Sequence, residues 1–142
     1  MKSVFRNIGA VLLGLFIGSA LNMGLIMVSG KVIPPPAGAD VTTMEGLKAS
    51  LHLFEPRHFL FPFLAHALGT LAGAAVATAV SAGRRAAYAF AIGAFFLAGG
   101  IANVIMLPAP LWFNAVDLTF AYLPMAWLGY RLASRRQDIT LR

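Results

Sequence analysis

The chain has no cysteine and only 5 acidic residues among its 142. The absence of cysteine excludes disulfides, thiolate catalysis, iron–sulfur clusters and cysteine zinc sites, and it leaves the redox compartment unreadable. Charged residues of both signs make up 11% of the chain, against 59% hydrophobic residues. A water-soluble domain of this composition would expose far more apolar surface than it could bury. The sequence therefore predicts a protein whose main solvent is the lipid bilayer.

Four long apolar stretches divide the chain, and they cover residues 8–29, 59–82, 86–107 and 111–129. Each stretch is long enough to cross a bilayer core of roughly 30 Å at about 1.5 Å per residue. We therefore predict an all-α fold, a four-helix transmembrane bundle that forms one domain over residues 1–142. The predicted spans are residues 8–29, 56–82, 86–107 and 111–133, with an outer loop and interfacial helix over residues 30–55.

Positive charge gathers on one side of the predicted membrane. The cations before the first span, between the second and third, and after the fourth are Lys2, Arg6, Arg84, Arg85, Arg131, Arg135, Arg136 and Arg142. The opposite side carries Lys31, Lys48 and Arg57, balanced by Asp40, Glu45 and Glu55. By the positive-inside rule, both termini face the cytoplasm.

The cationic side also predicts which partners the protein has. We expect anionic lipid headgroups to contact Arg84, Arg85, Arg131, Arg135 and Arg136. A nucleic-acid partner is not expected, because no basic stripe with interleaved aromatic residues is present. A membrane-protein partner remains open.

The first span has a competing interpretation as a cleaved signal peptide. Lys2 and Arg6 form a basic n-region, and residues 18–20 are small, as a cleavage site requires. The apolar run nevertheless continues through Val28, giving about 22 residues instead of the typical 7 to 15. We therefore expect this segment to be retained as the first helix.

Small residues recur at four-residue spacing in the first two spans: Gly14, Gly18 and Asn22, then Gly69, Gly73 and Ala77. Such stripes let helix backbones approach closely. They fit packing inside one bundle, and they also fit an interface between copies. We expect a homo-oligomer as well as a bundle, because four helices enclose little interior for a solute.

Proline placement predicts where the helices begin and bend. Pro62 and Pro124 lie within predicted spans, where each removes an internal hydrogen bond and should kink its helix. Pro56 suits the first turn of the second span. In the fourth span, Tyr122 is interpreted as an interfacial or packing aromatic residue.

The outer segment divides into an extended part and a helical part. Residues 33–40 contain three consecutive prolines and cannot be helical. Thr42 and Glu45 have the spacing of a capping box at a helix start, and apolar residues follow at helical spacing through Phe54. We predict a short amphipathic helix in the outer interface, which either covers apolar bundle ends or acts as a lid over a site.

Three histidines and one glutamate lie close together in the sequence: His52, Glu55, His58 and His66. A zinc or copper site needs three or four such ligands to converge. Pro56 breaks any single helix through His52 and His58, and His66 should lie about 12 Å deeper than His58. His52, Glu55 and His58 are therefore only candidate metal ligands. The alternative is that these histidines contact headgroups or water at the interface.

Four polar residues lie at one predicted depth: Asn22, His66, Asn103 and Asp117. Each is about 4 to 7 residues inside the outer end of its span, which places all four about 6 to 11 Å below the outer interface. Asn114 lies one helical turn above Asp117, and Thr70 lies one turn below His66. We predict a polar layer in the outer third of the membrane.

Asp117 is the only acid in any predicted span, and an unpaired carboxylate there would cost several kcal/mol. It should face inward, be paired, or be protonated. His66 is the obvious partner, and such a pair could relay protons or bind a small polar solute entering from the periplasm. The alternative is a structural hydrogen-bond network that fixes helix rotation. Because no catalytic motif accompanies the layer, we expect neither an enzyme nor a cofactor.

Two long strings resemble those of small bacterial four-span membrane proteins with no known activity: IPPPAGADVTTMEGLKASLHLFEPRHFLFPFLAHALGT and GGIANVIMLPAPLWFNAVDLTFAYLPMAWLGYRLA. The resemblance covers most of the chain and implies a bacterial inner-membrane protein of this topology, and it carries over no functional residues. The expected function is that of a small oligomeric protein that binds or passes a small polar solute, ion or proton around Asp117 and His66. The alternative is a non-catalytic accessory or structural subunit of a larger membrane complex.

Overall fold

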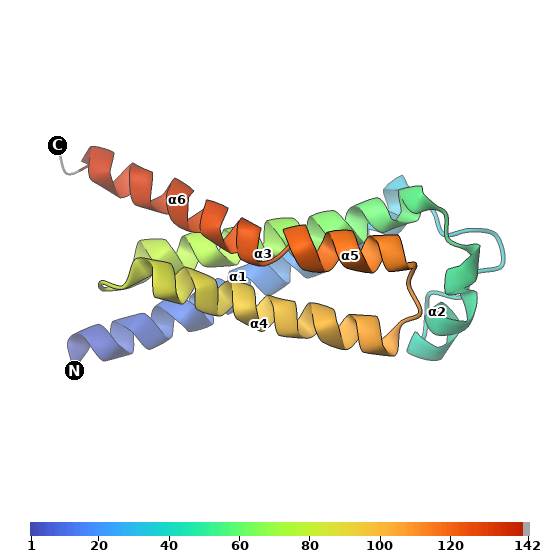
Figure 1. The fold of residues 1–142 in the computed structure, drawn as a ribbon, viewed down its shortest axis with the longest axis horizontal. Helices are drawn as coiled ribbons and strands as arrows, with labels where there is room; N and C mark the ends of the chain where they lie inside the picture. The colour runs from blue at the N-terminus through green and yellow to red at the C-terminus, as the bar shows by residue number, and fades with distance from the viewer. Residues whose placement is uncertain (141–142) are drawn as a thin grey trace.

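The chain runs along the length of an elongated helical bundle four times (Figure 1). The computed structural model describes the backbone of residues 1–140 and the side chains of residues 1–135. The passages are formed by α1 (Lys2–Val32), α3 (Leu60–Val80), α4 (Arg85–Met106), and finally α5 (Leu111–Phe120) with α6 (Leu123–Thr140). Both termini lie at one end of the bundle, and α2 (Met44–Ser50) lies at the other.

The expected all-α fold is confirmed for the described part of the chain, in which every regular element is helical. Three helical segments are long and apolar enough to cross a membrane: Lys2–Val32, Pro56–Val80 and Arg85–Met106. The second of these begins with a 3₁₀ turn, η2 (Pro56–Phe59). Proline is tolerated at that position because the first N–H groups of a helix have no partner inside it.

The predicted fourth span, residues 111–133, is not a single helix. α5 ends at Phe120, two residues bend, and α6 begins at Leu123. Pro124 explains the break, because it has no N–H to donate to the Phe120 carbonyl and its ring clashes with that carbonyl in a continuous helix. The predicted kink is therefore a complete interruption, and α6 diverges from the rest of the bundle toward the C-terminus (Figure 1).

Pro62 does not kink its helix as predicted. The α-helix begins at Leu60, so Pro62 is its third residue and lies in the first turn. A missing N–H breaks no internal hydrogen bond there. The proline consequently marks the start of α3.

Glycines bring α1 and α3 into backbone contact. A Cβ atom on Gly14 would lie 2.6 Å from the Gly73 carbonyl oxygen, and one on Gly18 would lie 2.7 Å from the Gly69 carbonyl oxygen. The reverse contacts are equally short, because a Cβ on Gly73 would lie 2.7 Å from the Gly14 oxygen. The predicted small-residue stripes therefore face each other inside the chain's own bundle, where α1 packs chiefly against α3.

The start of α1 closes the end of α3 at the terminus-bearing end of the molecule. Nε of Arg6 donates to the Val80 carbonyl at 2.6 Å, and its guanidinium also reaches the Ser81 carbonyl at 3.2 Å. The Asn7 side-chain oxygen accepts the Ala82 N–H at 2.7 Å. Arg6 thus places a cation on carbonyls at the C-terminal end of a helix, which lack partners inside the helix, and Asn7 accepts an N–H of the loop that follows.

A short helix, α2, is present in the segment where one was predicted, but it ends at Ser50 instead of continuing through Phe54, and its cap differs from the expected one. Thr43 is the N-cap, and its hydroxyl accepts the Gly46 N–H at 2.9 Å. Thr42 instead donates to the Asp40 carboxylate through its N–H at 2.8 Å and its hydroxyl at 2.6 Å. The hydroxyl and backbone N–H of Thr42 thereby hold the pKa of Asp40 below its usual 3.8. A second 3₁₀ turn, η1 (Leu51–Leu53), follows α2.

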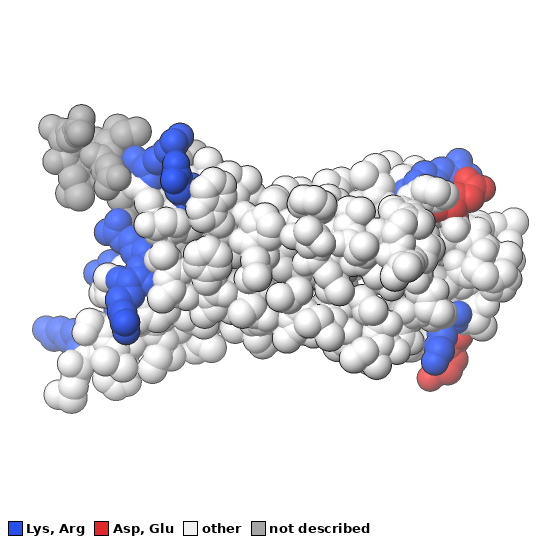
Figure 2. Space-filling model, in the orientation of Figure 1, with Lys and Arg blue, Asp and Glu red and all other residues white. Residues whose placement is uncertain are grey.

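On the face shown in Figure 2, the charged side chains lie at the two ends of the molecule, and the surface between them is uncharged. At the terminus-bearing end the described charged side chains are all Lys or Arg, whereas the other end carries both signs (Figure 2). Among the arginines expected to contact anionic lipid, Arg136 lies outside the residues whose side chains are described. The charge asymmetry of the sequence is thus an asymmetry between the two ends of the bundle.

Candidate functional site

His66 and Asp117 are in direct contact, although they lie 51 positions apart in the sequence. Nδ1 of His66 is 2.9 Å from Oδ1 and 3.0 Å from Oδ2 of Asp117. The imidazole extends from α3 and the carboxylate from α5. The pairing predicted from their common depth is therefore present in the structure.

Tyr122 completes the arrangement. Its hydroxyl donates to Oδ2 of Asp117 at 2.8 Å, and its ring stacks on the His66 imidazole with a centroid separation of 5.7 Å. Tyr122 is 2% exposed and Asp117 is 3% exposed, so both are buried inside the bundle. Of the two predicted roles of Tyr122, packing is confirmed, because its ring belongs to a buried cluster with Ala67 and Ala121, and the hydrogen bond to Asp117 is a further role that was not predicted. His66, Asp117 and Tyr122 are referred to below as the polar triad.

Two local features bring the Tyr122 hydroxyl to Asp117. On an unbroken α-helix the fifth residue onward lies about 140° around the axis, so the two side chains would diverge. The break between α5 and α6 removes this restriction. On α4, Gly100 supplies the space, because a Cβ atom there would overlap the hydroxyl and ring of Tyr122.

The hydrogen bonds define the roles of the ring nitrogens of His66. The Asp117 carboxylate accepts the Tyr122 hydroxyl, and it accepts from Nδ1 of His66 when that nitrogen carries a proton. Nε2 is then the basic nitrogen, and it has no hydrogen-bond partner among the described residues. The His66 side chain is 15% exposed. The imidazole can therefore take up a proton at Nε2 while Asp117 balances the positive charge.

Two other members of the predicted polar layer support backbone near the triad. The Thr70 hydroxyl donates to the His66 backbone carbonyl at 2.7 Å, one turn along α3. The Asn114 amide donates to the Ala109 carbonyl at 3.3 Å and so closes the turn that leads into α5. Both residues position the elements that carry the triad, and within the described part of the chain neither side chain is hydrogen-bonded to a triad side chain.

Asn22 and Asn103 are not hydrogen-bonded to the triad in the described part of the chain. Asn22 is partly buried, and its Cβ would lie 3.1 Å from a Cβ atom on Gly69, so it packs at the α1–α3 contact. Asn103 is exposed on the outside of the bundle. Of the four residues at one predicted depth, His66 and Asp117 are in contact, and the other two are not hydrogen-bonded to them in the described part of the chain. Depth does not determine which way a side chain faces.

The three candidate metal ligands of the outer segment do not converge. His52 is exposed, with Nδ1 2.9 Å from the Ala49 carbonyl, and Glu55 forms an ion pair with Arg57 at 3.0 Å. His58 is buried, and its Nδ1 lies 3.0 Å from the Glu55 backbone nitrogen. Among the described residues, no three His, Cys, Asp or Glu side chains are grouped in a way that could hold a metal ion.

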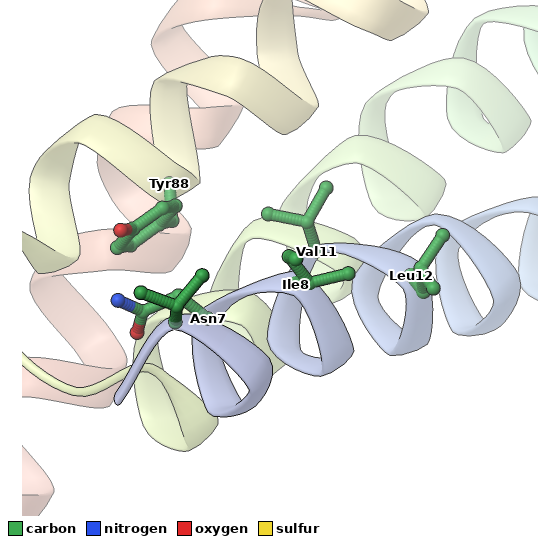
Figure 3. A pocket seen from close by; sticks show the side chains of 6 residues that line it. Asn7, Ile8, Val11, Leu12 and Tyr88 are labelled. Atoms are coloured by element: carbon green, nitrogen blue, oxygen red, sulfur yellow. The ribbon is translucent and has the colours of Figure 1, made fainter. Parts of the chain in front are cut away.

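Three surface hollows lie away from the polar triad, and none of the three is lined by its residues. An apolar hollow of about 330 Å³ between α1 and α4, near the termini, is lined by Val4, Asn7, Ile8, Val11, Leu12 and Tyr88 (Figure 3). A second, of about 320 Å³, lies between η2, the start of α3 and α5. Its lining residue Phe63 is one turn before His66, and Val116 adjoins Asp117. The third lies at the outer end of the bundle.

No family model, curated protein or solved structure matches the chain. The sequence resemblance to small four-span proteins therefore gains no support from these comparisons. The function of the site has to be inferred from its own geometry.

Proposed function

We propose that the protein is a four-span bacterial inner-membrane protein that binds a proton from the periplasmic side at its polar triad and can pass it onward. The buried contact of 2.9 Å between His66 and Asp117 carries this proposal. Ionisable groups inside membrane helices are costly to keep, and they commonly mark proton relays or solute sites.

The proposed topology follows from the four passages of the chain along the bundle. Three passages are made by segments that are long and apolar enough to span a membrane. We assign the fourth passage to α5 and α6 together, since the break between them faces the bundle interior, where Tyr122 is hydrogen-bonded. At one end of the bundle all the described charged side chains are Lys or Arg, and we assign this end to the cytoplasm by the positive-inside rule (Figure 2).

A proton suits the triad better than a larger solute. Asp117 and Tyr122 are almost fully buried, and each carboxylate oxygen of Asp117 already lies within hydrogen-bond distance of another triad side chain. With Asp117 ionised and His66 neutral, the site carries one negative charge, and protonation at Nε2 makes it neutral. Binding one proton therefore leaves the site without net charge in the membrane interior, where an uncompensated charge is costly.

Asn103 favours a second candidate, in which the chain is a homo-oligomer or an accessory subunit. Its amide is exposed at the depth of the apolar band, although polar side chains in membranes usually hydrogen-bond to another helix. A neighbouring polypeptide could supply that partner. Extraction in a mild detergent, followed by mass determination, distinguishes a homo-oligomer from a complex with a second protein in fixed ratio.

Proton flux into liposomes tests the leading proposal. The purified protein is reconstituted with a pH-sensitive dye inside, and a potassium diffusion potential drives uptake. We expect Asp117→Asn and His66→Gln to reduce the flux to that of protein-free liposomes, while His52→Gln, which changes an exposed histidine, leaves it unchanged. Equal flux for folded Asp117→Asn and the unmodified protein would refute a relay through the triad.

Nitrogen NMR of labelled histidine tests the assignment of the ring nitrogens, and the chain has only three histidines. We expect neutral His66 to be protonated at Nδ1, the nitrogen that contacts Asp117. A neutral form protonated at Nε2 would contradict the assignment of Nε2 as the basic nitrogen.

A further inference from the structure

A preformed hollow of about 460 Å³ lies at the outer end of the bundle, separate from the polar triad. Its lining consists of Val32, Ile33, Pro34, Pro35, Pro36 and Ala37 on one side, and Glu55, Arg57 and His58 on the other. Consecutive prolines adopt a stiff, extended backbone without internal hydrogen bonds. The first wall therefore keeps its shape without a ligand, which lowers the entropic cost of binding.

The second wall presents two opposite charges side by side. Glu55 and Arg57 form an ion pair at 3.0 Å, and their side chains are 61% and 66% exposed. A simple anion would be attracted by Arg57 and repelled by Glu55, and a simple cation would meet the reverse. A ligand that carries both charges can pair with each side chain at once.

His58 adds a hydrogen-bond donor between the two walls. Its Nδ1 lies 3.0 Å from the Glu55 backbone N–H, which can only donate, so Nδ1 is the acceptor. The Glu55 carbonyl, 3.2 Å from the same nitrogen, already accepts the His58 N–H at 2.9 Å. The ring proton of neutral His58 is therefore on Nε2.

The Nε2–H group of His58 is available to a ligand. It has no hydrogen-bond partner among the described residues. In that part of the chain, the side-chain N and O atoms that are buried and have no partner are Oγ1 of Thr78 and Oγ of Ser134. Nε2 of His58 has no partner there and is not one of these buried atoms. Although the residue as a whole is buried, this atom therefore reaches the surface, and His58 lines the hollow.

We propose that this hollow binds a phosphoester that also carries an ammonium group. Arg57 and the Nε2–H of His58 hold the phosphate oxygens, and the Glu55 carboxylate holds the ammonium group. Two sources share this chemistry, the ethanolamine headgroup of a phospholipid and soluble phosphoethanolamine. The apolar wall begins at Val32, where α1 ends, and is placed to contact the glycerol region of a lipid.

Lipid retention measured by native mass spectrometry tests the proposal. The full chain is purified in mixed micelles that contain equal amounts of phosphatidylethanolamine and phosphatidylglycerol. We expect preferential retention of phosphatidylethanolamine, weakened roughly fivefold by Arg57→Gln and by Glu55→Gln, as suits a partly exposed charge contact of about 1 kcal/mol. Lys48→Gln, which removes a cation of the same end outside the hollow, should behave like the unmodified protein.

The outcomes separate the two sources and can reject both. If millimolar phosphoethanolamine displaces the retained lipid, the ligand is soluble phosphoethanolamine. If the protein selects phosphatidylethanolamine and phosphoethanolamine does not displace it, the ligand is the phospholipid. Equal retention of the two lipids, or equal behaviour of Arg57→Gln, Glu55→Gln and Lys48→Gln, overturns the proposal. Because both altered side chains are exposed, helix content by circular dichroism should be unchanged in every variant.

Discussion

α3 has two interfaces that are built on opposite principles. Toward α1, Gly69 and Gly73 meet Gly18 and Gly14, and the backbones touch because no side chain intervenes. Toward α5 and the bend that follows it, His66 meets Asp117 and Tyr122, whose side chains carry hydrogen-bond donors and acceptors. The glycine interface requires the absence of side chains, so adding a side chain there destabilises it. The polar interface requires hydrogen-bond pairing, so removing or displacing one partner destabilises it.

The largest effect is expected from adding atoms to the glycine interface. Gly14→Val should lower the free energy of unfolding by about 3 kcal/mol, because its side chain would collide with the Gly73 carbonyl. Unfolding in detergent micelles measures the change. Gly9→Val is the matched control on the same helix, since a Cβ there meets nothing within 4 Å. Equal losses for both variants would show that helix propensity, not contact, explains the result.

A smaller effect is expected when atoms are added beside the triad. Gly100→Ala places a methyl group on the Tyr122 hydroxyl and should cost about 2 kcal/mol while displacing that hydroxyl from Asp117. Proton flux should fall even though the helices remain folded. Its sequence neighbour provides the control, because Gly99→Ala adds a methyl group to open space. If Gly100→Ala retained full flux, the Tyr122 contact would be dispensable for the proposed activity.

Removing a single donor from the triad should have a more modest effect. Tyr122→Phe deletes the hydroxyl that donates to Asp117 and should cost about 1 kcal/mol, the usual value for one hydrogen bond between membrane helices. Tyr130→Phe is the comparison, since Tyr130 makes no hydroxyl hydrogen bond within the described residues. Thermal unfolding of both variants in the same detergent gives the difference. Identical midpoints would place the triad's stability in the His66–Asp117 pair alone.

The smallest effect is expected where a polar contact faces water instead of the membrane interior. Because the Thr42 hydrogen bonds lower the pKa of Asp40, the stability that they add is present above pH 3.8 and is lost as the pH falls through the lowered value. Thr42→Val removes the hydroxyl and should raise the pKa of Asp40 toward 3.8. Carbon NMR of the carboxylates measures it, and no shift of the Asp40 titration would contradict this role.

Residue counting predicted positions along the helices better than it predicted which way their side chains face. Three helices that are long and apolar enough to span a membrane, and the His66–Asp117 contact, agree with the sequence, because helical rise determines how far along its helix a residue lies. Rotation is not encoded in the same way, since a helix surrounded by lipid is apolar on nearly every side. Asn103 shares the predicted polar layer with His66 and Asp117, and the structure exposes it on the outside of the bundle.

Tyr122 was missed because helical periodicity holds only within one helix. Counted along an unbroken span it faces away from Asp117, and only the break before Leu123 reverses this. Pro124 was the available signal, since a proline inside a span frees a carbonyl and loosens the register of its neighbours. The space at Gly100 also allows Tyr122 its position, but a single sequence does not show this, because the two residues come from separate parts of the chain.

The glycine contacts between α1 and α3 have a consequence for the order in which the protein forms during synthesis. The backbone contacts of this pair need only the first 80 residues, so the two helices can join as a hairpin soon after both have entered the bilayer. His66 must wait for Asp117, which is made 51 residues later. The imidazole thus enters the membrane without its acid, and the last two helices complete the site on a surface that is already assembled.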